Sequence, residues 1–199
     1  SPYDVVRHNA LLGVRAWPNG ELRFDGVRVP RSHMRGPGVG AEPEGGQNRR
    51  VWHFEQPRTL LAAMAVGIAQ AALDASLQYA KTREQFGRPI GGFQMVQGMI
   101  FDMVVETEAA RFLSYRAMAL QDRGEDSSWQ SAAAKAYATE SAVRTTSRAI
   151  EIHGALGLME EMPLERYFRD ARSLTIPDGT TEIQKLVVGR RLLGISAIT

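Results

Sequence analysis

Asp178, Gly179 and Thr180 precede the last helical stretch of the chain, so a carboxylate stands where a helix N-terminus is expected. An aspartate there is first of all an N-cap, because its side-chain oxygen accepts backbone N–H groups that the first helical turn leaves unpaired. The same N–H groups also bind anions such as phosphates. The residues by themselves leave two interpretations open, a structural cap and an anion-binding turn.

Residues 83–94 form a second candidate site, between two long helical stretches. Their glycines permit a close backbone approach, Arg83 can hold a phosphate through paired hydrogen bonds, and Phe86 can stack on a ring. A glycine- and proline-containing turn with solvated arginines is the structural alternative. Residues 151–157 end a further helical stretch, where two glycines are explained by a C-cap and a turn.

Other kinds of site find little support. His153 shares no metal-ligand spacing with the other three histidines, so we expect no metal site. The chain has no cysteine, which excludes thiol nucleophiles, disulfides and cysteine-ligated metals. The glycine fingerprint of dinucleotide-binding folds, the phosphate loop of nucleotide hydrolases and the serine-hydrolase elbow are absent. A self-contained Rossmann, kinase or hydrolase site is therefore not expected.

The charged residues argue against a nucleic-acid partner. The 24 basic residues are 21 Arg and 3 Lys, scattered among 22 acidic residues, and aromatic residues make up 8% of the chain. A nucleic-acid-binding protein usually clusters its basic residues among aromatics. The excess of Arg is typical of a GC-rich bacterial genome. No run of eighteen apolar residues predicts a membrane span, and no leader pattern follows Ser1, so we expect a cytoplasmic protein.

The candidate residues depend on helices for their positions. Periodic apolar residues predict long helices over 56–81, 96–120 and 126–150, and shorter ones over 163–172 and 178–193. The expected caps are Asp126 at the start of the third helix and Gly194 at the end of the last. Glu106 interrupts the second apolar stripe, and Arg111 is its expected partner. Long helices with short connections predict a mainly α, antiparallel four-helix-type bundle.

The first fifty residues differ in character. Residues 21–30 alternate apolar and polar side chains and predict a half-buried strand, with a turn at Asp25 and Gly26. Residues 36–48 are rich in glycine and proline, which is typical of a linker. So few strands cannot form an independent sheet. We therefore expect residues 1–48 to be the end of a β-domain plus a linker, and residues 49–199 to be a C-terminal helical bundle.

Four segments, taken in their order along the chain, resemble the C-terminal half of the acyl-CoA dehydrogenase family. ELRFDGVRVP at 21–30 resembles the strand that closes the family's middle β-domain, and REQFG at 83–87 resembles its flavin-phosphate loop. EIHGALG at 151–157 resembles its second flavin segment, and IPDGTTEIQ at 176–184 resembles its catalytic turn. The resemblance covers nearly the whole chain and implies the family's fold, with FAD as cofactor and an acyl-CoA thioester as substrate.

The resemblance also implies a role for each matching residue. The contacts to the FAD of a neighbouring subunit would be Arg83, Phe86 and Gln94 at the pyrophosphate and Glu151, Ile152, His153, Gly154 and Ala155 at the adenosine. Thr180 and Glu182 would contact FAD in their own subunit, and Arg58 and Gly179 would lie at the acyl-CoA pocket. Because one flavin would need two subunits, we expect a homo- or hetero-oligomer.

The implied reaction is α,β-dehydrogenation of the thioester, with Asp178 as the catalytic base. The α-proton of a thioester is weakly acidic, so its removal needs a positioned carboxylate in a desolvated pocket. FAD would take the β-hydrogen as hydride, and an electron-transfer flavoprotein or a similar acceptor would reoxidise the flavin.

The chain departs from the family pattern at the catalytic turn. Family members usually have Glu where this chain has Asp178, which is one methylene shorter, and Pro177 replaces a residue that is more often aromatic. Some members carry the base on the first long helix, near the position of Pro57. Glu55 is the other acid near either location, and we prefer Asp178 over it.

A second departure concerns the length of the chain. The family's N-terminal helical domain and most of its β-domain have no counterpart in these 199 residues. We therefore expect activity only when the missing N-terminal half, or a partner chain, supplies the rest of the site. Two alternatives remain open: a non-catalytic helical scaffold subunit of such an enzyme, and an enoyl-CoA reductase that runs the reaction in reverse.

Overall fold

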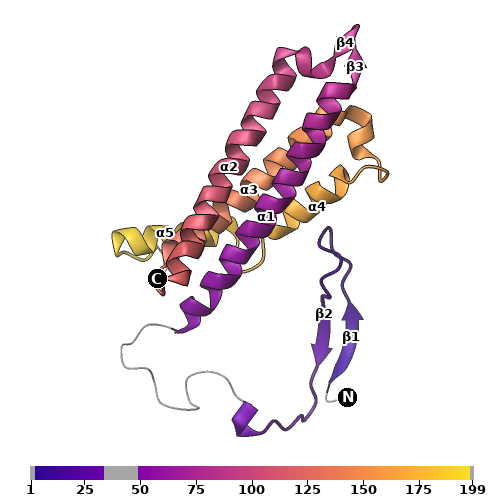
Figure 1. Cartoon of the computed structure of the whole chain (residues 1–199). Helices are drawn as coiled ribbons and strands as arrows, with labels where there is room; N and C mark the ends of the chain where they lie inside the picture. The colour runs from indigo at the N-terminus through magenta and orange to yellow at the C-terminus, as the bar shows by residue number, and fades with distance from the viewer. Residues whose placement is uncertain (1–2, 34–48, 198–199) are drawn as a thin grey trace.

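The computed structural model describes residues 3–33 and 49–197, and these residues are mainly helical. The α-helices are α1 Arg49–Thr82, α2 Gln94–Asp122, α3 Ser128–His153, α4 Leu164–Leu174 and α5 Thr181–Leu193. The first three run side by side in alternating directions, α4 lies along α3 and α1, and α5 lies at the end of the bundle where α1 begins (Figure 1). The predicted mainly α bundle is confirmed.

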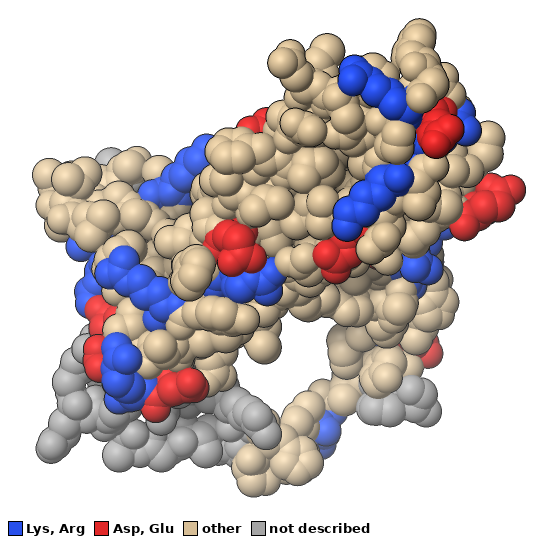
Figure 2. Space-filling model, turned by 45° about the horizontal axis from the view of Figure 1, so that its top comes forward, with Lys and Arg blue, Asp and Glu red and all other residues tan. Residues whose placement is uncertain are grey.

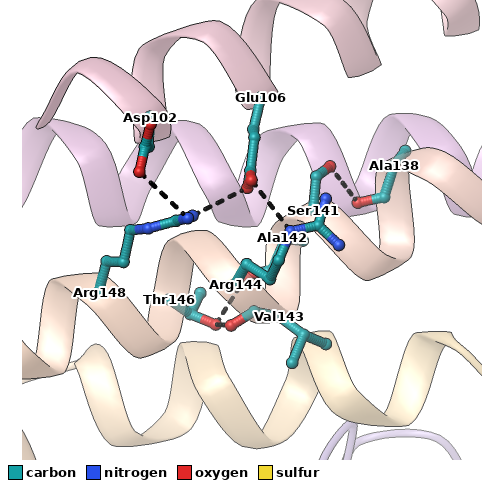
Figure 3. A network of polar contacts seen from close by, with 9 residues as sticks. All are labelled: Asp102, Glu106, Ala138, Ser141, Ala142, Val143, Arg144, Thr146 and Arg148. Atoms are coloured by element: carbon teal, nitrogen blue, oxygen red, sulfur yellow. Dashed lines mark hydrogen bonds and ion pairs between the residues drawn. The ribbon is translucent and has the colours of Figure 1, made fainter. Parts of the chain in front are cut away.

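α3 is the central helix and packs against each of the other four. Its interior face consists of small side chains, and Ala132, Ala138 and Ala142 are each at most 1% exposed. Small side chains let neighbouring helices approach closely, which a helix covered on several sides requires. Several buried hydroxyls of this helix bond within it: Ser141 donates to the Ala138 carbonyl at 3.0 Å and Thr146 to the Ala142 carbonyl at 2.7 Å (Figure 3).

An ion-pair network joins α2 to α3, and Figure 3 shows it from close by. Glu106 accepts hydrogen bonds from Arg144 at 3.0 Å and Arg148 at 3.1 Å, and Arg148 also lies 3.3 Å from Asp102. The prediction that Glu106 pairs with Arg111 is therefore wrong. Arg111 stands five residues along α2, where the helical repeat of 3.6 residues turns it away from α3, and it pairs with Glu108 instead.

Helix starts differ from the predictions by one to seven residues. α1 begins at Arg49 and contains Pro57, which was expected to lie near its start. A proline inside a helix lacks the N–H of one helical hydrogen bond and its ring crowds the preceding turn, so the residues before Pro57 are helical in spite of this cost. The N-cap of α3 is Ser127 and not Asp126. The Asp126 carboxylate still accepts the first N–H of the helix, from Ser128 at 3.0 Å.

α1 is also long and apolar enough over Phe54–Thr82 to cross a membrane by length and composition, and an 18-residue window within this stretch has a mean hydropathy of 1.7. The core helix of a soluble protein meets the same criteria, and 44% of this window is buried inside the protein. The expectation that no segment spans a membrane stays a prediction.

The N-terminal segment contains a two-stranded antiparallel sheet of β1 Asp4–His8 and β2 Gly20–Arg23. The predicted strand over 21–30 is correct only at its beginning. Its partner is β1, which precedes it, so the residues after Arg23 have no strand beside them in the described part of the chain. Gly26 has a φ of 59°, in agreement with the predicted turn. The predicted linker over 36–48 lies outside the described residues.

Residues 12–14 attach this segment to α4. The Val14 N–H donates to the Asp170 carboxylate at 2.5 Å, and Arg169 donates to the Leu12 carbonyl at 2.9 Å. A Cβ added at Gly13 would lie 2.3 Å from the Arg169 carbonyl oxygen, so only glycine permits this approach.

Candidate functional site

The turn between α4 and α5 has a left-handed backbone at two successive residues. Asp178 has a φ of 55° and Gly179 a φ of 99°. The left-handed form costs an L-residue about 1 to 2 kcal/mol, and such conformations persist where the surroundings hold them. A φ of 99° is one that L side chains rarely adopt, and a Cβ added at Gly179 would lie 2.7 Å from the Gln184 amide nitrogen, so this position favours glycine.

Side chains from three helices hold the two carbonyl groups of this turn. Gln184 of α5 donates to the Asp178 carbonyl at 3.0 Å and to the Gly179 carbonyl at 2.8 Å. Arg58 of α1 donates through Nε to the Asp178 carbonyl at 3.4 Å, and Lys135 of α3 donates to the Gly179 carbonyl at 2.7 Å. Among the described residues, none donates a hydrogen bond to the Asp178 carboxylate, which is partly exposed. The turn therefore offers this carboxylate to a ligand.

Arg58 is buried beside the turn, with 6% of its surface exposed. Burial lowers the pKa of its guanidinium, while the charges of Glu55 and Asp178 raise it. Its Nη1 atom is buried and has no hydrogen-bond partner among the described residues. Because leaving a buried charged donor unpaired is costly, this atom is a site where a ligand oxygen would be favourable.

Glu55, the alternative base, is buried and already hydrogen-bonded within the protein. Its carboxylate accepts a 2.9 Å hydrogen bond from Ser127, which precedes α3, and the residue is 6% exposed. Burial raises the pKa of this carboxyl, and the Ser127 hydrogen bond lowers it. Asp178 has no such bond and is more exposed, so the geometry favours Asp178 as the group that meets a substrate.

The cap of α5 is Thr180 and not Asp178, so the cap interpretation of Asp178 is wrong. The Thr180 hydroxyl accepts the Ile183 N–H at 3.5 Å. Glu182 is exposed in the first turn, where a hydrogen bond from its own backbone N–H lowers the pKa of its carboxyl. Because Thr180 caps the helix, the Asp178 side chain is not needed for that role.

The loop after α1 is a tight hairpin of β3 Glu84–Gln85 and β4 Arg88–Pro89. Its two central residues, Phe86 and Gly87, both have positive φ, at 54° and 77°. This backbone is that of a type I′ turn, where an aromatic residue is unusual. The Phe86 side chain is 92% exposed, and Arg83 and Gln94 are exposed as well.

The predicted adenosine contacts divide into two groups. Glu151, Gly154 and Ala155 are exposed at the end of α3 and in the following turn η3 Gly154–Leu158. Ile152 and His153 are buried. The His153 ring stacks on Tyr79 with a centroid separation of 4.2 Å, its Nδ1 lies 2.8 Å from the Ala149 carbonyl, and burial lowers its pKa. The side chains of these two residues therefore face the core.

The predicted residues gather at opposite ends of the bundle. Asp178, Gly179, Thr180, Glu182 and Arg58 belong to the end where α1 begins, whereas residues 83–94 and 151–155 lie toward the other end (Figure 1). At 1.5 Å per residue, the stretch of α1 from Arg58 to its last turn is about 36 Å long. The hairpin and the Asp178 turn of one chain are therefore far apart along the bundle.

Charged side chains are dispersed on the face that Figure 2 draws, with Lys and Arg separated by uncharged surface and by Asp and Glu. Among the described residues, no three His, Asp or Glu side chains are grouped so that they could hold a metal ion.

Lys135 and Gln184 hold the turn and were not predicted from the sequence as site residues. Both are completely buried. A lysine inside the alanine-rich face of the third helix is the signal that was available, since a lysine is almost never buried without a partner. Nothing local to Gln184 distinguishes it from an ordinary residue of an amphipathic helix.

Comparison with known proteins identifies one family. The family model described as "Acyl-CoA dehydrogenase, C-terminal domain" matches residues 44–193. The chain is 42% identical over 193 residues to the probable acyl-CoA dehydrogenase YngJ of Bacillus subtilis, covering 97% of this chain and 48% of that protein.

Solved structures agree with this match. The butyryl-CoA dehydrogenase of Megasphaera elsdenii superposes with a TM-score of 0.88 at 35% identity, covering 96% of this chain and 49% of that one. The structure of PigA with FAD and proline gives a TM-score of 0.85 at 30% identity, with coverage of 96% and 49%. The chain spans about half the length of the relatives it matches.

Proposed function

The chain belongs to the acyl-CoA dehydrogenase family, and we propose that it is the C-terminal half of an FAD-dependent enzyme that introduces an α,β double bond into an acyl-CoA thioester. The observation that carries this proposal is the held turn at Asp178. It presents a partly exposed carboxylate, without a hydrogen-bond donor of its own among the described residues, next to a buried arginine with an unpartnered nitrogen.

Asp178 is the base in this proposal. Arg58 and Gln184 hold the Asp178 carbonyl, and Lys135 holds the Gly179 carbonyl, so the carboxylate has a defined place from which to take the α-proton. The unpartnered Nη1 of Arg58 is suited to an oxygen of the thioester substrate, and a cation there stabilises negative charge that develops as the proton leaves. FAD, when bound, supplies the acceptor for the β-hydride.

The exposed hairpin suits the proposed FAD contacts. Phe86 presents an exposed aromatic ring and Arg83 is an exposed arginine, which match a ring and a pyrophosphate. Glu151, Gly154 and Ala155 are accessible to the adenosine through side chain or backbone, whereas Ile152 and His153 could contribute only through their backbone. The solved relative PigA, which was determined with FAD, supports this cofactor.

An oligomer is part of the proposal. The hairpin and the Asp178 turn of one chain lie toward opposite ends of the bundle, so in this proposal the hairpin residues would serve the flavin of a neighbouring chain. Thr180 and Glu182 would contact the flavin of their own chain, with Gly179 and Arg58 at the substrate. The acceptor of the electrons would be an electron-transfer flavoprotein or a similar protein.

The remaining parts of the proposal concern organisation. We assign residues 1–48 to the end of a β-domain with its linker and residues 49–199 to the helical bundle. The hairpin of β1 and β2 exposes Val5, Val6, Leu22 and Phe24, which suits strands that belong to a larger sheet. The rest of that sheet would come from a longer form of the chain or from a partner chain, and the protein would act in a bacterial cytoplasm.

The test uses the complete flavoprotein, purified with whatever supplies the N-terminal half. Under anaerobic conditions, a series of acyl-CoA thioesters of increasing chain length is expected to bleach the flavin absorbance. Asp178→Asn is expected to abolish bleaching while the flavin stays bound, because asparagine tolerates the left-handed backbone but cannot take a proton. Asp122→Asn, an exposed change at the end of α2, is the matched control and should bleach as the wild type does.

Other results would favour the alternatives. A preparation without flavin would contradict the proposal. Flavin that stays oxidised with every thioester, with no effect of Asp178→Asn, would indicate a non-catalytic scaffold. Reduced flavin that is reoxidised rapidly by enoyl-CoA, together with slow bleaching by acyl-CoA, would indicate a reductase.

A further inference from the structure

Lys135 is completely buried in α3 and has no carboxylate within hydrogen-bonding distance among the described residues. Its ammonium group donates to the Thr175 carbonyl at 2.8 Å and to the Gly179 carbonyl at 2.7 Å. Burial lowers the pKa of this group to about 8. A methionine of similar length would avoid the cost of burying a charge, so the ammonium group calls for a role that an apolar side chain could not fill.

The two carbonyl groups belong to two different structural elements. Thr175 is the C-cap of α4, where a cation interacts favourably with the carbonyl end of the helix. Gly179 belongs to the left-handed turn that begins α5. One ammonium group therefore ties the end of α4 to the turn and constrains the path of the three residues between Thr175 and Gly179.

We propose that Lys135 is a positioning residue that holds the Asp178–Gly179 turn in its left-handed form and thereby places the Asp178 carboxylate for proton abstraction. The proposal rests on the function proposed above for Asp178. Lys135 acts through the backbone of the turn and does not itself need to touch the substrate.

The other two donors cannot replace Lys135. The Arg58 bond to the Asp178 carbonyl is long, at 3.4 Å, and does not reach Gly179. Gln184 belongs to α5 itself, so its bonds tie the turn to the helix that follows but not to the rest of the bundle. Lys135 alone among these three contacts both α4 and the turn from the central helix.

The protonation of Lys135 should control how firmly the turn is held. The charged groups that act on it are Asp178 in the turn, Arg58 on α1, Glu140 on its own helix and Glu182 on α5. A neutral amine can still donate to both carbonyls, but hydrogen bonds from a charged donor are about twice as strong. The hold on the turn should therefore weaken as pH rises through about 8.

The first test needs no catalysis. Hydrogen–deuterium exchange is measured on the complete flavoprotein for the peptide that spans 176–182. In Lys135→Met, exchange in this peptide is expected to rise by at least about tenfold at pH 7, because charge-assisted hydrogen bonds are lost. The matched control is Lys185→Met, an exposed lysine on α5, and it should exchange as the wild type does.

A pH series on the wild type keeps the test decisive if Lys135→Met does not fold. After correction for the intrinsic pH dependence of exchange, the 176–182 peptide should lose protection about threefold between pH 7 and pH 9. Lys135→Arg, which stays charged across this range, should show no such step. A wild type without the step, or a folded Lys135→Met with wild-type exchange in this peptide, would overturn the proposal.

The second test joins the inference to the reaction. Lys135→Met is expected to lower kcat by about tenfold or more and to change KM for acyl-CoA by less than about threefold, since the substrate contacts remain. If Asp178→Asn abolishes bleaching but Lys135→Met keeps the wild-type kcat, the inference about Lys135 fails alone. If Asp178→Asn has no effect, the proposed function fails, and the exchange experiment still decides whether Lys135 holds the turn.

Discussion

Arg58 and Asp178 are 120 residues apart in the chain, and the Arg58 Nε donates to the Asp178 backbone carbonyl at 3.4 Å. The acceptor of this bond is the backbone carbonyl of Asp178 and not its carboxylate. The second nitrogen of the same guanidinium, Nη1, is buried and unpartnered in the described part of the chain. One arginine thus supports the turn and also offers a charged donor beside it.

Arg58→Lys is expected to lower kcat/KM for acyl-CoA by about 10- to 100-fold, which corresponds to the loss of one hydrogen bond to a charged group. Lysine lacks the planar fork that can serve the turn and a ligand together. Steady-state kinetics on the flavin-loaded enzyme would measure this change. Arg190→Lys, at an exposed position on α5, is the control, and an equal loss there would count against a specific role for Arg58.

Gly179→Ala is expected to destabilise the protein by about 1 to 3 kcal/mol, because alanine would adopt a strained left-handed backbone and its Cβ would contact the Gln184 amide. Thermal unfolding would measure the effect. Gly189→Ala is the matched control on α5, where an added Cβ has no atom within 4 Å. That change should stabilise the protein by about 0.5 to 1 kcal/mol. Equal effects at both positions would contradict the account of the turn.

The buried ammonium of Lys135 makes stability depend on pH. Its pKa is about 8 in the folded protein and 10.5 in an unfolded chain, so the unfolded chain binds more protons between these values. The contribution of this group to the free energy of unfolding therefore rises with pH from 8 to 10.5, by up to about 3 kcal/mol.

Urea unfolding of the wild type and of Lys135→Met at pH 7.5 and pH 10 would measure this contribution as a difference between the two proteins. The wild type should gain stability relative to the variant at the higher pH. A constant difference across this range would show that Lys135 is not the group responsible.

Glu106→Gln is expected to destabilise the bundle by about 1 kcal/mol, more than most exposed ion pairs contribute. Its carboxylate is 17% exposed and meets two arginines of α3, whereas Glu108 is 48% exposed and meets only Arg111. Glu108→Gln should therefore cost about 0.5 kcal/mol or less. Denaturant unfolding at low and high salt would compare the two, and the Glu106 effect should shrink with salt.

Phe86→Ala is expected to weaken FAD retention without changing the stability of the flavin-free protein. Its side chain is 92% exposed, so its loss removes little packing inside the chain. Flavin content after gel filtration, measured beside thermal unfolding, would separate the two effects. Leu192→Ala is the control. It removes another exposed apolar side chain, which is 61% accessible, and it should leave flavin content unchanged.

Local patterns predicted the helices well and their ends less well. The apolar repeat in α2 and the small residues of α3 are local properties, and both appear in the structure as expected. The predicted start of α1 was wrong because the apolar repeat that indicated this helix begins at Leu61, whereas the helix itself begins at Arg49. The cap of α5 was wrong because Asp178 and Thr180 are both good N-caps by type, and only the backbone shape decides between them.

Pairing between distant segments was less predictable. β2 was recognised by its alternation, but β1 was not, and the sequence did not show that residues after Arg23 would lack a partner. Likewise, Glu106 was expected to pair within its own helix, whereas the arginines that bind it come from α3. In both cases the partner is set by how elements pack, which short windows of sequence do not contain.

The sequence by itself determined the family and the helical character, because motif order and apolar periodicity are properties of neighbouring residues, and it proposed residues that can carry chemistry. Only the tertiary structure decided what holds the Asp178 turn. Arg58, Lys135 and Gln184 reach it from three helices, and two of them are far from it along the chain. Every residue has a backbone carbonyl, so the residue type at an accepting position does not indicate which side chain will donate to it. The sequence around Gly179 therefore could not predict its hydrogen bond from Lys135 on α3.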